Sequence, residues 1–305
     1  MKKYPSYLNL SENEFQKRIN QAYKFLESCK LCPHCCKVNR IAGQKGICRS
    51  TAELKISSFN AHFGEEPPIS GVYGSGTIFF TNCTLRCIYC QNYPISQLSN
   101  GNTISVSDLS SIMLTLQKQR CHNINLVTPT HFVPQILKAV AQSRTSGLKI
   151  PLVYNTSGYE SSETLKLLDG IIDIYLPDAK YAEDDVAEKY SKAEKYSLVN
   201  KDALREMYRQ VGNLRMSKSG IAVSGLIIRH LVLPQNLSGT DKILTWVAEN
   251  ISKKTYISLM AQYFPAFQAS EYPALSSRIS KDEYKRARKY FDNSGLVNGW
   301  FQQYN

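Results

Sequence analysis

The chain has 305 residues, of which 43% are hydrophobic, and its formal net charge is +12. This length permits one large α/β barrel or two smaller domains, each with a substantial core. No apolar stretch approaches the roughly 20 residues of a membrane span, and no apolar segment typical of a secretion signal follows Lys2 and Lys3, so we expect a cytoplasmic protein that does not enter membranes.

The basic residues are scattered along the chain and form no long basic block. Even the densest stretch, Lys281 to Lys289, mixes charged with apolar residues and is typical of a solvated helix face. Nucleic acid is therefore not an expected partner. The charge favours solubility and leaves an acidic protein surface or a nucleotide-like substrate open as partners.

Residues 11–28 predict an α-helix, because apolar side chains recur there at helical spacing. Ser11 and Glu14 are placed to form a capping box in its first turn. The apolar positions are Phe15, Ile19, Ala22, Tyr23 and Leu26.

A cysteine-rich loop follows this helix. Nine cysteines in an odd, clustered arrangement favour metal ligation in a reducing compartment over a disulfide framework. Four thiolates at these spacings suit either a structural zinc ion or a fully ligated [4Fe–4S] cluster, and spacing does not choose between them; buried thiols or disulfides are the simpler alternative. The predicted ligands, called here the N-terminal cysteine group, are Cys29, Cys32, Cys36 and Cys48, with Cys35 as a substitute for Cys36.

Residues 53–76 are rich in Gly, Pro and Ser and predict an irregular segment that crosses into the next unit. We therefore expect two parts. Residues 1–70 would form the N-terminal helix and the metal-binding segment, and residues 71–305 would form a barrel.

Residues 83–90 place three cysteines at C-x3-C-x2-C spacing directly after an apolar strand. A [4Fe–4S] cluster normally has four thiolate ligands, so three cysteines leave one iron open, as in a reactive rather than a structural centre. A zinc knuckle or buried core thiols are the alternatives, but zinc sites usually pair two short clusters and no second pair follows closely. The ligands of this cysteine triplet would be Cys83, Cys87 and Cys90.

From the triplet onward, strand and helix patterns alternate. Six β–α units in series predict a parallel sheet, and barrels of parallel strands carry their chemistry at the carboxyl ends of the strands. Helical spacing predicts one helix behind Ser107 as N-cap, another around residues 133–140, and a charged helical insert over Tyr181–Gly220. The expected strands are Thr77–Thr81, Ile124–Val127, Leu152–Asn155, Ile171–Leu176, Leu226–Leu233 and Tyr256–Met260.

Polar residues follow the second and third strands. Thr128 and Thr130 offer hydroxyl groups, and His131 is either an acid–base group or a helix cap. Asn155 and Ser157 carry an amide and a hydroxyl suited to a ligand's hydroxyl or carboxylate groups, or they belong to a polar turn.

The remaining strand ends are also polar. Lys180 suits a carboxylate and Asp178 suits a hydroxyl group or a cation, although an ordinary surface pair is the alternative. Alternation along the fifth strand sends Arg229 and His230 to opposite faces, so at most one of them lines the barrel. Gln262 follows the sixth strand and either reaches a ligand or packs structurally.

The triplet resembles the signature of the radical S-adenosylmethionine (radical SAM) superfamily, in which an aromatic residue precedes the last cysteine, as Tyr89 does here. This resemblance implies a partial (β/α)6 TIM-like barrel with a [4Fe–4S] cluster whose open iron chelates the amino and carboxylate groups of SAM. One electron, from a donor such as flavodoxin or ferredoxin, cleaves SAM to a 5′-deoxyadenosyl radical. Many members hold the SAM amino group with Gly-Gly-Glu; this chain has Val127–His131 there, so Thr128 and Thr130 would supply that contact.

Two further strand ends are similar to those of glycyl-radical-enzyme activases. Asp178-Ala-Lys180 matches their Asp-x-Lys element, in which the pair faces SAM and the substrate, so the resemblance makes both residues catalytic. Residues 229–234 match their Arg-x-Val-Val-x-Pro strand. The implied SAM-binding residues are Tyr89, Thr128, Thr130, Asn155, Ser157, Asp178, Lys180, Arg229 and Gln262.

Over residues 29–300 the sequence looks like the PflX-type branch of pyruvate formate-lyase-activating-enzyme-like proteins. Val-Thr-Pro-Thr-His, Tyr-Asn-Thr-Ser-Gly-Tyr, Arg-His-Leu-Val-Leu-Pro and the N-terminal cysteine group carry this match. The implied function is radical SAM hydrogen abstraction, with a backbone position of a partner protein as the first candidate substrate and a small molecule as the second. A non-catalytic zinc- or Fe–S-binding regulatory protein is the alternative from a different class.

Overall fold

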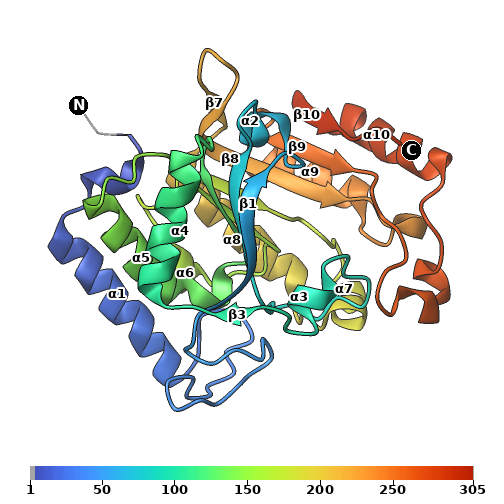
Figure 1. The fold of residues 1–305 in the computed structure, drawn as a ribbon. Coiled ribbons are helices and arrows are strands. Elements are labelled where there is room, and N and C mark those ends of the chain that lie inside the picture. The colour runs from blue at the N-terminus through green and yellow to red at the C-terminus, as the bar shows by residue number, and fades with distance from the viewer. Residues whose placement is uncertain (1–3, 305) are drawn as a thin grey trace.

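The computed structural model describes residues 4–304 and contains a mixed α/β fold around one largely parallel sheet (Figure 1). In the described part of the chain the strand order is β10-β9-β8-β6-β5-β4-β2-β1-β3, with β7 paired to β8 beside this path. Neighbours from β2 to β10 along this order are parallel. These parallel strands are β2 (Ser75–Phe80), β4 (Ile124–Val127), β5 (Leu152–Thr156), β6 (Ile174–Pro177), β8 (Ala222–Leu231), β9 (Tyr256–Met260) and β10 (Asn298–Phe301).

The six parallel strands expected from the sequence are all present, and β4 and β9 have the expected bounds. Their side chains are buried almost continuously, as parallel strands covered by helices require. β8 begins earlier than expected, at Ala222, because its first residues pair with the short strand β7 (Arg215–Met216).

The prediction that residues 53–76 form an irregular segment is wrong for the first half of that segment. Residues 55–62 form β1 (Lys55–His62), which pairs antiparallel with β2 and, at its start, with β3 (Asn102–Thr103). Much of β1 is exposed, so its sequence lacks the apolar run that marks the buried strands. The rest of the segment contains the short helix α2 (Pro67–Ser70) and the first two residues of β2.

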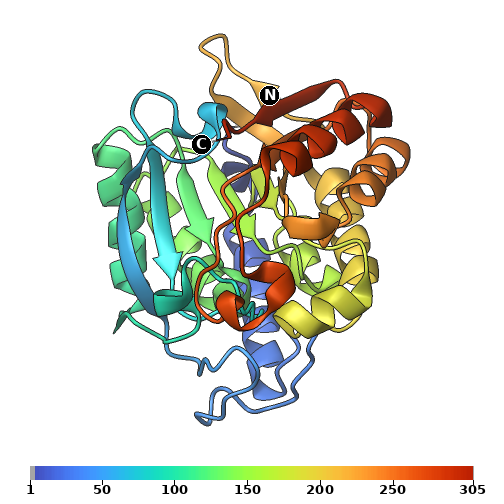
Figure 2. The ribbon, with the colours of Figure 1, turned by 90° about the vertical axis from the view of Figure 1, so that its right-hand side faces the viewer.

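Helices surround the sheet on its outer face (Figure 2), whereas inner-face residues such as Val153, Leu176 and Ile227 pack against one another. The chain forms helices between successive parallel strands, and α1 packs outside α5 and α6. None of the helices in residues 4–304 is long and apolar enough to cross a membrane. The α-helices are α1 (Glu12–Glu27), α2, α3 (Tyr93–Ser96), α4 (Val106–Lys118), α5 (Val133–Thr145), α6 (Ser162–Leu167), α7 (Asp184–Ser191), α8 (Tyr196–Val211), α9 (Thr240–Asn250) and α10 (Lys281–Ser294), and the 3-10 helices are η1 (Ser6–Asn9), η2 (Thr130–Phe132), η3 (Pro234–Asn236), η4 (Ala269–Glu271) and η5 (Pro273–Leu275).

The helix starts follow capping chemistry, with two corrections. Ser11 caps α1 by accepting a hydrogen bond from the backbone N–H of Glu14, as predicted, but the predicted capping box does not form, because the Glu14 carboxylate pairs with Arg18. The N-cap of α4 is Ser105 and not Ser107, since Ser105 and Asp108 form a reciprocal capping box. The predicted helical insert contains α7 and α8, and α8 packs against β6 and β8.

The division at residue 70 remains a prediction. The largest hydrophobic cluster joins Phe15 and Leu26 of α1 to Ile78 and Phe80 of β2. Residues 28–54, which contain the N-terminal cysteine group, have no helix or strand.

Candidate active site

A cavity of about 390 Å³ lies at the carboxyl ends of the parallel strands. Phe79 of β2 and Met260 of β9 both line it. These strands are five positions apart in the sheet, which is about 24 Å if the sheet were flat. The sheet must therefore curve, and the cavity lies where its concave face opens.

Arg229 is the centre of an ionic network in this cavity. Its Nε donates to Asp178 Oδ1 at 3.1 Å, its Nη1 lies 3.3 Å from Glu65 Oε2, and its Nη2 donates to Asn155 Oδ1 at 2.9 Å. Lys180 Nζ lies 2.7 Å from Asp178 Oδ2. The structure thus brings together the predicted residues of the third, fourth and fifth strands in one hydrogen-bonded unit.

Glu65 is a cavity residue that the sequence did not reveal. Its side chain is 9% exposed, and it accepts hydrogen bonds from Asn125 at 3.0 Å and Asn155 at 3.4 Å besides its pair with Arg229. Burial raises the pKa of Glu65, and the Arg229 guanidinium offsets only part of this increase. A carboxylate within a Gly- and Pro-rich segment was the only sequence signal for it.

The charges of Asp178 and Lys180 stabilise one another. Burial alone would raise the pKa of Asp178, but Lys180 and Arg229 outweigh it and lower this pKa. Burial alone would lower the pKa of Lys180, but the Asp178 carboxylate raises it. Both groups therefore stay charged at the mouth of the barrel.

The other predicted SAM-binding residues divide into two sets. Tyr89 and Gln262 line the cavity. Thr128, Thr130 and Ser157 do not belong to its lining: the Thr130 hydroxyl donates at 2.6 Å to the buried carboxylate of Glu160. Their roles in SAM binding remain predictions.

The two histidines considered from the sequence are buried and away from the cavity. His230 lies between the Ala179 carbonyl, 2.6 Å from Nδ1, and the Thr240 hydroxyl, 2.9 Å from Nε2, so only Arg229 of that pair lines the barrel, as predicted. His131 Nε2 lies 2.8 Å from the Thr81 carbonyl. Burial lowers the pKa of His131 to about 3 and that of His230 to about 4, so both imidazoles are neutral near pH 7.

Each sulfur of the cysteine triplet has a hydrogen-bond partner. The backbone N–H of Leu85 donates to Cys83 Sγ at 3.3 Å, the Ser191 hydroxyl donates to Cys87 Sγ at 2.9 Å, and Cys90 Sγ lies 3.1 Å from Ser96 Oγ. Hydrogen bonds to sulfur are among the interactions by which proteins tune iron–sulfur clusters.

The end of α7 positions the triplet loop. The backbone N–H groups of Arg86 and Ile88 donate to the Ser191 and Tyr190 carbonyls at 2.9 and 3.0 Å. Tyr89 continues this contact, because its hydroxyl lies 2.5 Å from that of Tyr181, which lies 2.7 Å from Ser191 Oγ. No pattern in residues 184–191 indicates that α7 would hold the triplet loop.

The three thiols of the triplet lie near one another. Within residues 4–304, no three His, Cys, Asp or Glu side chains are arranged to hold one metal ion, and this holds for the triplet and for the N-terminal cysteine group alike. In a four-iron cluster each thiolate ligates a different iron, so the sulfurs stand apart around a shared space. Burial raises the pKa of Cys83 to about 12, and the nearby thiols of Cys87 and Cys90 add to this increase.

Cys32 lies near the other members of the N-terminal cysteine group. Burial raises the pKa of the Cys32 thiol well above its ordinary value, and the thiols of Cys48, Cys29 and Cys36 raise it further. The backbone N–H of Ile47 points at Cys36 Sγ at 3.5 Å. The chain passes so close here that a Cβ on Gly46 would lie 2.7 Å from the same sulfur.

Hydrogen bonds join the N-terminal cysteine loop to the triplet loop. His34 Nε2 lies 2.8 Å from the carbonyl oxygen of Thr84, next to the first triplet cysteine. The Asn82 amide donates to Ser50 Oγ at 2.9 Å, and Arg49 donates to the Gln97 carbonyl at 3.3 Å. The two cysteine sites are therefore direct neighbours.

No protein-family model matches the chain. The chain is 29% identical over 290 residues to the uncharacterized protein MJ0674 of Methanocaldococcus jannaschii, covering 92% of this chain and 78% of that protein. The structure of TYW1 with a lysine-pyruvate adduct bound is similar with a TM-score of 0.46 and 12% identity, covering 71% of this chain and 73% of that one. Methylornithine synthase (PylB) is similar with a TM-score of 0.48 and 12% identity, covering 97% and 80%. Because both TM-scores lie below 0.5, we draw no functional conclusion from these two structures.

Proposed function

We propose that this protein is a radical SAM enzyme. The observation that carries the proposal is the cysteine triplet itself: three thiols, each with a hydrogen-bond partner at sulfur, next to a polar cavity at the carboxyl ends of parallel strands. When bound there, a [4Fe–4S] cluster supplies one electron that splits SAM into methionine and a 5′-deoxyadenosyl radical, which abstracts hydrogen from the substrate.

The residues of the chain bind and orient SAM in this proposal. Cys83, Cys87 and Cys90 hold the cluster and leave one iron open to SAM. Lys180 has three N–H donors, so it can keep its bond to Asp178 and also bind the SAM carboxylate.

The carboxylates of the cavity face the positive part of the ligand. Glu65 and Asp178 balance the SAM sulfonium charge, and Arg229 fixes both carboxylates. Tyr89, Asn155 and Gln262 supply polar groups around the ligand. Thr128, Thr130 and Ser157 belong to the proposed site only if their loops move on binding.

We further propose that the N-terminal cysteine group holds a second metal site, either structural zinc or a [4Fe–4S] cluster. Four thiols in one place, all nine cysteines free, suit metal ligation in a reducing compartment such as the cytoplasm. The Ile47 N–H pointing at Cys36 Sγ suits a metal-bound thiolate.

For the substrate, we propose a backbone position of a partner protein, by analogy with the activases that share the Asp-x-Lys and Arg-x-Val-Val-x-Pro elements. A flavodoxin or ferredoxin would supply the electron. This assignment rests on motif similarity, and a small-molecule substrate would use the same residues.

Anaerobic reconstitution with iron and sulfide tests the proposal. We expect a brown protein that, with dithionite, converts SAM to 5′-deoxyadenosine. Replacing any one triplet cysteine with Ala should abolish this conversion, because two thiolates do not retain the cluster. Cys121→Ala, which removes a buried thiol elsewhere, serves as the matched control. A colourless protein that binds only zinc, or full conversion by a triplet variant, would refute the proposal and favour a non-catalytic metal-binding protein.

A further inference from the structure

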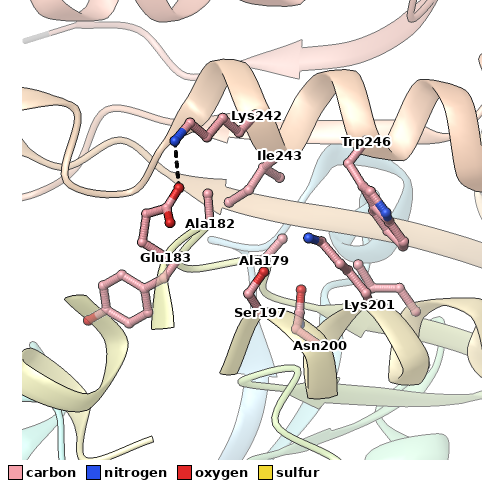
Figure 3. A pocket seen from close by; sticks show the side chains of 11 residues that line it. Ala179, Ala182, Glu183, Ser197, Asn200, Lys201, Lys242, Ile243 and Trp246 are labelled. Atoms are coloured by element: carbon pink, nitrogen blue, oxygen red, sulfur yellow. Dashed lines mark hydrogen bonds and ion pairs between the residues drawn. The ribbon is translucent and has the colours of Figure 1, made fainter. Parts of the chain in front are cut away.

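A second cavity lies outside the barrel, between α8, α9 and the segment that follows β6 (Figure 3). Its volume of about 240 Å³ is below the range of about 300–1,000 Å³ that is typical of drug-sized ligands. The cavity therefore suits a compact ligand with a single ring. Ile243 and Leu204 give it apolar walls, and Trp246 provides a flat aromatic surface.

One cation in this cavity has no counter-ion. At one end, Lys242 Nζ pairs with Glu183 at 2.6 Å. At the other end, no carboxylate in the described part of the chain lies within 4 Å of Lys201 Nζ, which lies 5.7 Å from the centre of the Trp246 ring. Figure 3 shows the Lys201 ammonium pointing into the cavity. The lining thus carries one uncompensated positive charge, which favours a ligand with one negative charge.

Two buried polar side chains add hydrogen-bonding capacity. The Ser197 hydroxyl has no hydrogen-bond partner among residues 4–304, although the residue is only 9% exposed. Asn200 is 4% exposed and uses its Nδ2 to donate to the carbonyls of Gly158 and Asp178, both at 3.0 Å. Its Oδ1 faces the cavity (Figure 3). The cavity therefore offers one hydroxyl and one amide oxygen to a ligand.

We propose that this cavity binds a small planar carboxylate with an O–H or N–H group, and that the bound ligand regulates the proposed active site. The carboxylate pairs with Lys201 and accepts from the Ser197 hydroxyl. The ring lies against Trp246, and the ligand's donor reaches Asn200 Oδ1. The regulatory part rests on the proposed function, whereas the binding part does not.

The connection to the active site runs through a single stretch of backbone. Ala179 lines this second cavity, and its neighbours Asp178 and Lys180 line the cavity in the barrel. Asn200 touches both sites, because its Oδ1 faces the ligand while its Nδ2 holds the Asp178 carbonyl. A ligand that engages Asn200 therefore alters the position of the Asp178–Lys180 pair.

Fluorescence tests the binding part. The chain has two tryptophans, so Trp300→Phe leaves Trp246 as the reporter of the cavity. We expect 4-hydroxybenzoate to quench this fluorescence and its uncharged methyl ester to bind at least about tenfold more weakly. Lys201→Gln should weaken 4-hydroxybenzoate binding by a similar factor, Lys201→Arg should restore it, and Lys254→Gln, at an exposed lysine elsewhere, should leave it unchanged. Equal affinity for acid and ester, no quenching by either, or an unaffected Lys201→Gln variant would overturn the proposal.

SAM titrations test the regulatory part. In the reconstituted protein, saturating 4-hydroxybenzoate should change the SAM dissociation constant severalfold, and Lys201→Gln should remove this effect. A SAM affinity that does not respond to 4-hydroxybenzoate overturns the regulatory part. Failure of SAM to bind at all counts against the proposed function instead, and leaves the fluorescence result valid.

Discussion

Replacing Lys180 with Ala removes the cation that we place against the SAM carboxylate. In the structure this ammonium is 2.7 Å from Asp178 Oδ2, its side chain is only 17% exposed, and it lines the cavity beside Cys87. Arg229 still pairs with Asp178 in the variant, so the carboxylate keeps one partner and the fold should persist.

The expected loss follows from one charge-assisted contact. Such a contact contributes about 1.5–3 kcal/mol, which corresponds to roughly 10- to 150-fold in SAM affinity. The lower value applies if Lys180 must leave Asp178 to reach SAM, and the higher value applies if its three N–H groups serve both carboxylates at once.

Calorimetric titration of SAM into the anaerobically reconstituted protein measures this effect. Lys281→Ala is the matched control, since it removes an exposed lysine at the first position of α10. Equal SAM affinity for the two variants would show that Asp178 and Lys180 form only a structural pair, and the similarity to the activases would then fail at this strand.

Three further predictions follow from the buried groups. Replacing all four members of the N-terminal cysteine group with Ser should remove one metal site and leave the triplet's cluster. A fall in iron from about eight to about four per chain indicates a second [4Fe–4S] cluster, and a fall in zinc from about one to zero indicates a structural ion. Unchanged metal content would contradict metal ligation by these cysteines. Glu65→Gln should lower the free energy of unfolding of the apoprotein by about 1–3 kcal/mol, because Arg229 loses one of its two carboxylates; urea unfolding that gives an unchanged or higher value would contradict this reasoning. Burial raises the pKa of Glu160 from 4.5 to about 7, so the carboxyl group holds its proton more tightly in the folded than in the unfolded protein. This difference stabilises the folded state fully below pH 4.5, and the stabilisation is lost as the pH rises toward 7. A glutamine at position 160 does not titrate, so the unfolding free energy of Glu160→Gln minus that of the original protein should rise by about 1.4 kcal/mol per pH unit across this window. A difference that stays constant with pH would show that the pKa of Glu160 is not raised.

The sequence predicted those strands and helices that are determined by residues close to one another in the chain. The parallel strands were recognisable because both of their faces are buried, one under helices and the other against side chains of neighbouring strands, which selects short continuous apolar runs such as Ile124–Val127. β1 was missed because its exposed residues need no apolar run; it forms through pairing with β2. The N-cap of α4 was misplaced by two residues, since Ser105 and Ser107 both precede the apolar stripe and only the Asp108 side chain selects the first.

The residues of the candidate site likewise divide into those that local sequence patterns identified and those that they did not. Spacing alone identified the triplet, and strand ends identified Asn155, Asp178, Lys180 and Arg229, because parallel strands bring their carboxyl ends to one edge. Glu65 meets Arg229 from 164 residues away, and nothing in the residues around Glu65 specifies that contact. Ser191 reaches Cys87 across 104 residues.

The antiparallel pairing of β1 with β2 sets the distance between the two cysteine sites. Ser50 precedes β1 and Asn82 follows β2, so their hydrogen bond closes the open end of this hairpin. The pairing shifts register between Ile56 and Ser58, where β1 carries an extra residue as a bulge.

Hairpin register is therefore part of the geometry of both cysteine sites. Removing one residue at the bulge, such as Ser57, would displace the N-terminal cysteine loop by about 3.3 Å along β2 and turn the preceding side chains to the other face. Both the Ser50–Asn82 and the His34–Thr84 hydrogen bonds would then be lost, although every cysteine is retained. Length changes in this exposed strand should consequently be tolerated far less well than substitutions of its side chains.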